Sequence, residues 1–462
     1  MSEGLKKVDE KDKYDRHDYR QPGQAYLTFA LPLLLGNLFQ QLYNMVDSVV
    51  VGNYVGKNAL AAVGTCGSMS FLFFSLSSGL AIGIGIIVSQ FYGAKNEQQV
   101  RNTIANSIYV LATAALAVSV LGILLCPALL RLLQTPEHIM EDATLYLRTT
   151  CAGIIAIALY NGVAAVLRAL GDSRTPLYFL ILSSVVNVIL DLAFVIYCDM
   201  GVFGVALATI ISQAVSAVTC LLYAYHKVPY FRLTREELRP HKAIILKSFR
   251  LGIPMALQSS MIAISCMVLQ GVVNSFGDTV MAAFTITSRV EQIIQQPFNS
   301  LGTAMTTYAG QNMGAGKPDR VRKGLRQATL MILAFCLLMV PIFFLLGPQI
   351  VRIFVKEQDV IEMGYRALRI TSLFYFGLGM IYVPRGLLNG CGDTAFSMIN
   401  GITEVACRIG YSQILLRIPI LGYWSVWITT GLTWITVATV CMIRYLSGKW
   451  RQKGLVQERE LS

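Results

Sequence analysis

Charged side chains are scarce in this chain. Asp, Glu, Lys and Arg make up 14% of its 462 residues and hydrophobic residues make up 55%, and the mean hydropathy is +0.57. A soluble domain of ordinary composition is excluded, because about a quarter of its residues would be charged. The apolar residues come in blocks of roughly 20, the length of a membrane-spanning helix. Alternating strands of about 10 residues, which build membrane barrels, are not seen. We therefore predict an all-α membrane protein.

Motifs of enzymes and of ATP-driven pumps are also absent. The segment at residues 52–57 reads GNYVGK, one residue short of the phosphate-binding GxxxxGK spacing. No HExxH or GxSxG motif occurs, and the four histidines do not cluster. The ten cysteines include no CxxC pair, so neither a zinc site nor a disulfide framework is indicated. We predict no enzyme activity, no cofactor and no metal other than a coupling ion.

Positive charge is unevenly distributed along the chain. We predict twelve membrane helices, at residues 26–51, 59–90, 103–127, 144–167, 176–198, 202–225, 245–273, 279–309, 324–347, 361–384, 394–416 and 422–445. With both termini in the cytoplasm, the cytoplasmic segments and adjoining helix ends hold 28 of the 38 Lys and Arg residues. This positive-inside bias explains the net charge of +12 without nucleic-acid binding. No cleavage pattern of a signal peptide follows the charged amino-terminal residues.

The two halves of the chain repeat one another. QFYGA at 90–94 matches QNMGA at 311–315, and Gly-Asp at 171–172 matches Gly-Asp at 392–393, with the same offset for both pairs. One fixed offset along the whole chain indicates a duplicated unit. Six helices per unit make the halves parallel, with a substrate route between them. The predicted boundaries are 1–25 for a cytoplasmic polar N-terminus, 26–225 for the N-terminal bundle, 226–244 for a cytoplasmic linker, 245–446 for the C-terminal bundle and 447–462 for a cytoplasmic tail.

A polar stripe ending in a carboxylate runs along the first predicted helix. Its members Asn37, Gln40, Asn44 and Asp47 are spaced by 3, 4 and 3 residues and share one helical face. An acid inside a membrane helix costs at least a few kcal/mol, so it faces protein or water and often serves function. Its predicted partners are Asn187 and Asp191, four residues apart, and Thr209 on the next helix. Hard oxygen ligands suit Na⁺, and the same carboxylates can hold a proton. An interhelical hydrogen-bond cluster without a transport role is the alternative.

The second half carries its ionisable groups elsewhere. Val268 and Leu269 stand where the repeat would place an acid like Asp47. The eighth predicted helix instead has a strongly polar face. We predict that this face lines a cavity with Arg289, Glu291, Gln292 and Gln295. Glu404 and Arg408 are four residues apart and are predicted to pair. The glycines at 79, 83 and 85 have the spacing of close helix packing.

Several stretches together resemble one transporter family. These are Pro32 with the polar stripe, GNYVGKNALAAVG (52–64), SQFYGAKN (89–96), LRALGDSRTP (167–176), NVILD (187–191) and LLNGCGDT (387–394). As an ordered set they are similar to the multidrug and toxic compound extrusion (MATE) family, over essentially the whole chain. The resemblance implies a V-shaped pair of six-helix bundles that exports cationic or amphipathic drugs in exchange for Na⁺ or H⁺.

Within that family the chain looks most like the bacterial branch with a cation site in the N-terminal lobe. The resemblance assigns the cation site to Asp47, Asn187, Asp191 and Thr209, and the cavity wall to Gln40, Tyr43 and Asn161. The glutamate that another branch carries in its seventh helix is replaced here by Met261. The expected setting is the bacterial inner membrane, crossed many times by a monomer.

Two other functions fit the same helices. A flippase for a lipid-linked cell-wall or polysaccharide precursor would need several Arg or Lys in its cleft for the pyrophosphate. Only Arg289, Arg408 and Arg385 stand near membrane depth. A channel would need a filter, which the duplicated carrier architecture does not suggest. The prediction is therefore an antiporter that works by alternating access, with cation binding reshaping the first helix near Pro32.

Overall fold

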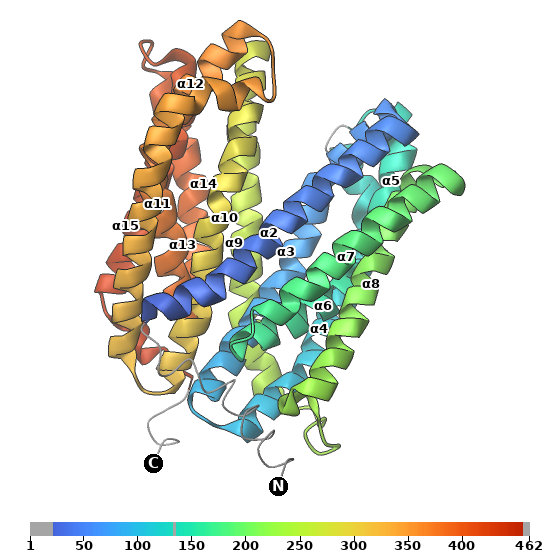
Figure 1. Cartoon of the computed structure of the whole chain (residues 1–462), viewed down its shortest axis with the longest axis vertical. Coiled ribbons are helices and arrows are strands. Elements are labelled where there is room, and N and C mark those ends of the chain that lie inside the picture. Colours follow the sequence, from blue (N-terminus) through green and yellow to red (C-terminus); the bar gives the residue numbers. More distant parts are fainter. Residues whose placement is uncertain (1–21, 133–134, 456–462) are drawn as a thin grey trace.

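The computed structural model describes residues 22–132 and 135–455, which are helical with no strand in either range. Two bundles diverge from a shared lower end and form a V (Figure 1). Most of the predicted N-terminus, and residues 456–462 of the predicted tail, lie outside the described residues. The N-lobe contains α2 (Pro22–Val50), α3 (Lys57–Gly93), α4 (Glu97–Leu132), α5 (Glu137–Ala152), α6 (Ile154–Ala169), α7 (Arg174–Leu192) and α8 (Gly201–Lys227).

The C-lobe repeats this order of helices. It contains α9 (Lys242–Asn274), α10 (Asp278–Gly314), α11 (Pro318–Arg352), α12 (Gln358–Ser372), α13 (Tyr375–Gly390), α14 (Thr394–Leu416) and α15 (Ser425–Leu446). Several helix ends are copied at the same offset that relates the sequence motifs. For example, α6 ends at Ala169 and α13 at Gly390, and α3 ends at Gly93 and α10 at Gly314. The duplication predicted from the sequence is therefore also a duplication of structure.

The number of membrane spans agrees with the prediction. Among the described residues, seven helices are long and apolar enough to cross a membrane, and nine when each bent pair α5–α6 and α12–α13 counts as one span. The long helices α2, α10 and α14 complete twelve spans. These three helices carry the polar stripes and ion pairs noted in the sequence, which lower their hydropathy.

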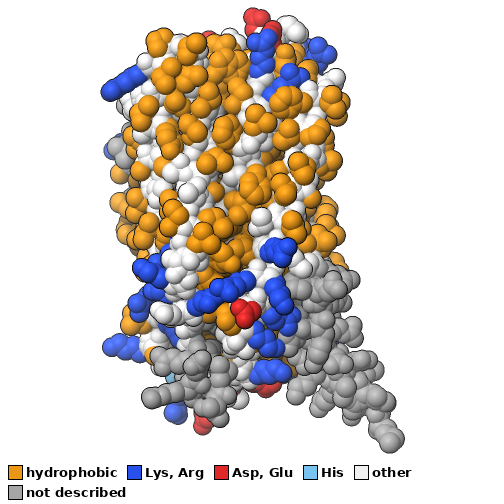
Figure 2. Space-filling view, turned by 90° about the vertical axis from the view of Figure 1, so that its left-hand side faces the viewer, with side chains coloured by type: hydrophobic (Ala, Val, Ile, Leu, Met, Phe, Trp, Pro, Cys, Tyr) orange, Lys and Arg blue, Asp and Glu red, His pale blue; other side chains and the backbone are white. Residues whose placement is uncertain are grey.

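The outer surface has the pattern of a membrane protein. Figure 2 shows a broad band of hydrophobic side chains over the C-lobe, with Lys and Arg gathered at both edges and most densely at the lower one. The lower edge is the end at which α2 begins and α15 ends (Figure 1). An apolar band bordered by charge is what a bilayer requires of the surface that faces lipid.

Two spans that the sequence analysis treated as continuous are bent in the structure. The predicted span 144–167 is α5 and α6, which meet at 44°, and the span 361–384 is α12 and α13, which meet at 50°. Thr150 donates its hydroxyl to the Tyr146 carbonyl, and its repeat mate Thr371 donates to the Leu368 carbonyl. Hydroxyls that bond back to the helix bend it. The bends are thus part of the repeated unit.

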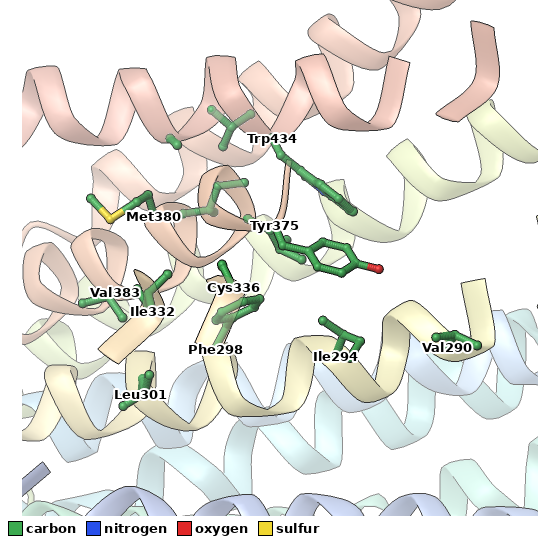
Figure 3. Close-up of a cluster of buried hydrophobic side chains, with 14 of the residues drawn as sticks. Val290, Ile294, Phe298, Leu301, Ile332, Cys336, Tyr375, Met380, Val383 and Trp434 are labelled. Atoms are coloured by element: carbon green, nitrogen blue, oxygen red, sulfur yellow. The ribbon is translucent and has the colours of Figure 1, made fainter. Parts of the chain in front are cut away.

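Packing of the C-lobe decides which face of α10 is left uncovered. Val290, Ile294, Phe298 and Leu301 point into a core shared with residues of α11, α13 and α15 (Figure 3). Their spacing of 4, 4 and 3 residues puts them on one side of the helix. A different side carries Ser300, which accepts a hydrogen bond from Asn37 of α2 at 3.3 Å. That polar side of α10 therefore faces the N-lobe.

The two lobes pack closely against each other where α3 crosses α9. A Cβ atom on Gly83 would lie 2.7 Å from the backbone nitrogen of Gly252, and one on Gly79 would overlap the backbone of Ala256. Gly85 packs instead on Ala165, inside its own lobe. The close packing predicted from these glycines is confirmed, and for two of them it joins the lobes.

Helix α2 passes from one lobe to the other. Near its start, Tyr26 donates its hydroxyl to the Met305 sulfur at 2.9 Å and stacks obliquely on Tyr308, both in α10. After Pro32 the helix crosses to the N-lobe (Figure 1) and packs along α7. One helix therefore links the lower end of the C-lobe with the upper part of the N-lobe.

Candidate functional site

The upper part of the N-lobe holds a buried polar cluster. Asn187 and Asp191, one helical turn apart on α7, are fully buried. Asn187 donates from Nδ2 to the Thr209 hydroxyl of α8 at 3.4 Å, and Thr209 donates in turn to the Val205 carbonyl at 3.1 Å. Asp47, from α2, is half-buried, and its carboxyl group faces that of Asp191 within hydrogen-bonding reach. The structure thus brings the four residues together from three helices.

Several oxygen atoms in this cluster accept no hydrogen bond from the described part of the chain. They are Oδ1 of Asp47, both carboxyl oxygens of Asp191 and Oδ1 of Asn187, and all four atoms are buried. Buried polar atoms in native proteins are almost always paired, so a group of four points to a missing partner. Two facing carboxylates also repel each other unless a proton or cation lies between them. These residues therefore fit a small cation or a shared proton.

Two tyrosines border the acids. Tyr43, one turn before Asp47 on α2, lies within electrostatic reach of both carboxyl groups and within hydrogen-bonding reach of Gln40. Tyr146 of α5 lies within electrostatic reach of the same two acids and of Tyr43. Sequence reasoning identified Tyr43 but missed Tyr146. Nothing in the sequence around Tyr146 could have drawn attention to it, because its place depends on the bend that follows at Thr149 and Thr150.

Both acid-bearing helices end in a π-helical turn. Val51–Val55 follows α2 and Ala193–Tyr197 follows α7, and the two turns touch. Their residues Val51 and Val195 pack in an apolar cluster with Val50, Val202 and Val205. π-helical turns are rare and are frequent at functional sites. Here they close the acid cluster on the side of the upper helix ends.

The facing surfaces of the lobes carry uncovered polar groups. Gln40 and Asn44 are exposed on α2, and Arg289 and Gln292 are exposed on α10. Because Arg289 lies on the same helical face as Ser300, three turns away, it is on the side of α10 that meets α2. Asn161 takes a different position, donating to Ser78 at 3.3 Å inside the N-lobe. The predicted wall residues therefore divide between the inter-lobe surfaces and the lobe interior.

The C-lobe holds several charged side chains in its interior. Glu291 is buried on the core side of α10, next to Thr371, whereas Gln292 beside it is exposed. Gln295 is half-buried and accepts from the Tyr382 hydroxyl at 3.3 Å. The residues predicted to form one polar face, at positions 289, 291, 292 and 295, thus occupy different sides of α10. Residues 291 and 292, for example, are about 100° apart around a helix.

Ion pairing neutralises part of the C-lobe interior. The predicted pair is confirmed, since Arg408 donates to Glu404 at 3.3 Å and both are buried. Arg385, also buried, lies over the Tyr382 ring and donates to Oε1 of Gln258 at 2.7 and 3.2 Å. Arg385 and Arg408 are therefore held by protein groups, and Arg289 is the uncovered cation of this wall.

Twelve membrane spans in two parallel repeats, with buried ionisable groups in both lobes, are the construction of a secondary transporter. Comparison with known proteins agrees. The MatE family model matches residues 32–193 and 254–412. The chain is 30% identical over 439 residues to the probable multidrug resistance protein YpnP of Bacillus subtilis, covering 93% of this chain and 96% of that protein. It is 27% identical over 440 residues to the probable multidrug resistance protein NorM of Thermotoga maritima, with 94% of each covered.

Solved structures show the same fold. A MATE transporter crystallised in the bent conformation superposes with a TM-score of 0.87 at 23% identity, over 94% of this chain and 97% of that one. An outward-facing multidrug resistance MATE transporter gives 0.87 at 23%, over 95% and 98%. The chain belongs to the multidrug and toxic compound extrusion family. It is a multi-pass membrane transporter and not an enzyme.

Proposed function

We propose that this protein is a multidrug efflux antiporter. It exports cationic or amphipathic small molecules in exchange for Na⁺ or H⁺, as a monomer in the bacterial inner membrane with both termini in the cytoplasm. The names of its relatives, which are multidrug resistance proteins, support the cargo class. The observation that carries the exchange is the set of four buried, unpaired oxygens of Asp47, Asp191 and Asn187.

The coupling ion would neutralise the two facing carboxylates. Na⁺ would take oxygens of Asp47, Asp191 and Asn187 together with the Thr209 hydroxyl, all of which are hard ligands. A proton would instead sit between the two carboxyl groups and remove their mutual repulsion. In either case two negative charges on buried carboxylates are unfavourable. The cluster should therefore bind its cation most tightly in the conformation that buries the two carboxylates most completely.

Helix α2 connects this site with the surface between the lobes. Its upper end carries Asp47, its middle carries the exposed Gln40 and Asn44, and its lower end contacts α10 through Tyr26. Pro32 lies between these parts and removes one backbone hydrogen bond of the helix. Cation binding at Asp47 would therefore change the balance between two positions of α2, by the difference in cation affinity between them.

The cargo would bind between the lobes, against the exposed Gln40 and Asn44 of α2 on one side and the exposed Arg289 and Gln292 of α10 on the other. Asn161 and Glu291, which point into their own lobes, would not contact it. A negatively polarised N-lobe favours cationic groups, and the apolar parts of α2 and α10 suit a hydrophobic body. A pyrophosphate-bearing lipid is a weaker candidate, because Arg385 and Arg408 are already occupied by Gln258 and Glu404.

The test is transport of a fluorescent cation by the purified protein in proteoliposomes, with Na⁺ and H⁺ gradients imposed separately. Wild-type protein should respond to one gradient at least. Asp47→Asn and Asp191→Asn should lose gradient-driven transport, while Asp278→Asn, an exposed acid at the start of α10, should keep it. Full transport by both N-lobe variants would show that the coupling assignment is wrong.

A further inference from the structure

The closed lower end of the V is held by contacts that obey the internal repeat. Gln90, near the end of α3, is fully buried and donates from Nε2 to the Gly390 carbonyl of α13 at 2.8 Å. Gln311, near the end of α10, donates from Nε2 to the Ala169 carbonyl of α6 at 2.8 Å. The two donors are repeat mates, and so are the two acceptors. Each lobe therefore gives the same amide to the same carbonyl of the other lobe.

The local structure explains why these groups are available to each other. Ala169 and Gly390 are the last residues of α6 and α13, and the last carbonyls of a helix have no partner within it. Glycines let the backbones meet, since a Cβ on Gly93 would overlap the Gln311 carbonyl and one on Gly314 would overlap the Gln90 carbonyl. The contact is a self-complementary interface like that of a twofold dimer, built here within one chain.

One half of this interface has an additional support. The backbone nitrogen of Leu455 donates to Oε1 of Gln90 at 2.7 Å, and Leu455 packs against an apolar cluster of the N-lobe. The segment that carries it follows α15 of the C-lobe and is anchored by buried Trp450, whose indole nitrogen donates to the Tyr445 carbonyl at 3.0 Å. Thr234, the repeat mate of Leu455, instead donates its backbone N–H to Glu237 at 2.7 Å. The tail thus breaks the symmetry.

We propose that Gln90 and Gln311 form a latch that keeps the lower end shut, and that the segment Lys449–Leu455 reinforces its Gln90 half. The proposal rests on the alternating access proposed above, in which this end must open once per cycle. Opening separates the α3–α13 and α10–α6 contacts together, so both amide bonds break. Gln90 and the apolar cluster under Leu455 both belong to the N-lobe, so opening also requires Leu455 to leave both of them or the segment Lys449–Leu455 to leave the C-lobe.

The experiment measures the opening directly, by the distance between two spin labels. The labels replace Arg174 and Ala395, exposed repeat mates at the lower end of the two lobes, in a background where the exposed Cys198 and Cys266 are serine. Gln311→Ala should lower the ratio of short to long distances about fivefold, the worth of one neutral hydrogen bond. Gln90→Ala should lower it further, because it also removes the acceptor of the Leu455 N–H. The matched control is Gln98→Ala, whose amide bonds to Asn102 within α4.

Two further variants separate the latch from simple loss of folding. Gln90→Glu keeps the acceptor for Leu455 and loses the donor to Gly390, so it should open the lower end with the tail still in place. Deletion of residues 449–462 should open it about fivefold and should change the effect of Gln90→Ala while leaving that of Gln311→Ala unchanged, as expected for coupled and uncoupled sites.

The result that would overturn the latch is an unchanged distance distribution in Gln90→Ala and Gln311→Ala at wild-type thermal stability. If the deletion changed the effects of Gln90→Ala and Gln311→Ala equally, the segment Lys449–Leu455 would have no specific role at Gln90. Because the distances are measured without cargo, this outcome is independent of drug transport. A protein that moves no drug but opens as described would refute the cargo assignment and keep the latch.

Discussion

The crossing of α3 and α9 allows a quantitative test with a single added methyl group. In Gly83→Ala the new Cβ would lie 2.7 Å from the backbone nitrogen and 2.8 Å from the Cα of Gly252, whereas ordinary contacts begin near 3.4 Å. The two helices must therefore separate by about 0.7 Å, because a backbone, unlike a side-chain end, cannot turn aside. The separation acts on the contact that joins the lobes.

The expected cost follows from two opposing terms. Overpacking of this kind costs about 1–3 kcal/mol, and replacing glycine by alanine inside a helix returns up to about 1 kcal/mol. Gly271→Ala in α9 is the matched control, since nothing lies within 4 Å of its added Cβ, and it has the second term alone. The two variants should differ by about 1–3 kcal/mol in the free energy of unfolding.

The assay is thermal unfolding in detergent followed by tryptophan fluorescence, together with cargo transport in proteoliposomes. We expect Gly83→Ala to unfold at a lower temperature than Gly271→Ala and to transport more slowly, and Gly83→Val to be worse in both respects. If Gly83→Ala and Gly271→Ala unfold at the same temperature, then the backbones of α3 and α9 are not in the contact described, and the reasoning fails.

Three further predictions concern the ionisable groups. Glu404→Gln leaves the buried Arg408 unpaired and should destabilise the protein by about 3–5 kcal/mol in thermal unfolding, with most of the loss recovered on adding Arg408→Gln; a neutral single variant would contradict this. Asn187→Ala removes one of the proposed oxygen ligands without removing charge. If Na⁺ is the coupling ion, transport should then need roughly tenfold more Na⁺, whereas proton-driven transport should be unaffected. Arg289→Gln should leave the free energy of unfolding within about 0.5 kcal/mol of wild type. It should lower the export of a zwitterionic cargo, whose carboxylate Arg289 would bind, more than the export of a simple cation. Equal losses for the two cargoes in a competition assay would exclude contact between Arg289 and the carboxylate.

Features that depend on spacing along one helix could be predicted from the sequence. Asn187 and Asp191 share a face because they are four residues apart, and Glu404 and Arg408 pair for the same reason. The duplication was visible because both copies kept the glycines and glutamines that the contact between lobes requires. Twelve spans followed from the length and composition of the apolar blocks, although three of them hold enough polar residues to be ambiguous by hydropathy alone.

Features that depend on contacts between distant segments could not be predicted from the sequence. Nothing near Tyr146 in the sequence indicates that the bend after it would place its ring within electrostatic reach of Asp47 and Asp191. The side of α10 on which Glu291 lies depends on how the C-lobe core closes around Phe298. The matching segments around Gln90 and Gln311 were recognised as copies, but a repeat does not say that each copy binds the other lobe rather than its own.

The unequal hydropathy of the helices has a consequence for how the protein enters the membrane. Helices α2, α10 and α14 are the spans with the weakest claim to insert by themselves, since each polar group at the centre of a helix opposes insertion by up to about 3 kcal/mol. Each is followed in the chain by a strongly apolar helix, namely α3, α11 and α15. We expect these pairs to be inserted as hairpins, with the second helix retaining the first. Asp47 would then reach the bilayer only because α3 emerges from the ribosome behind it.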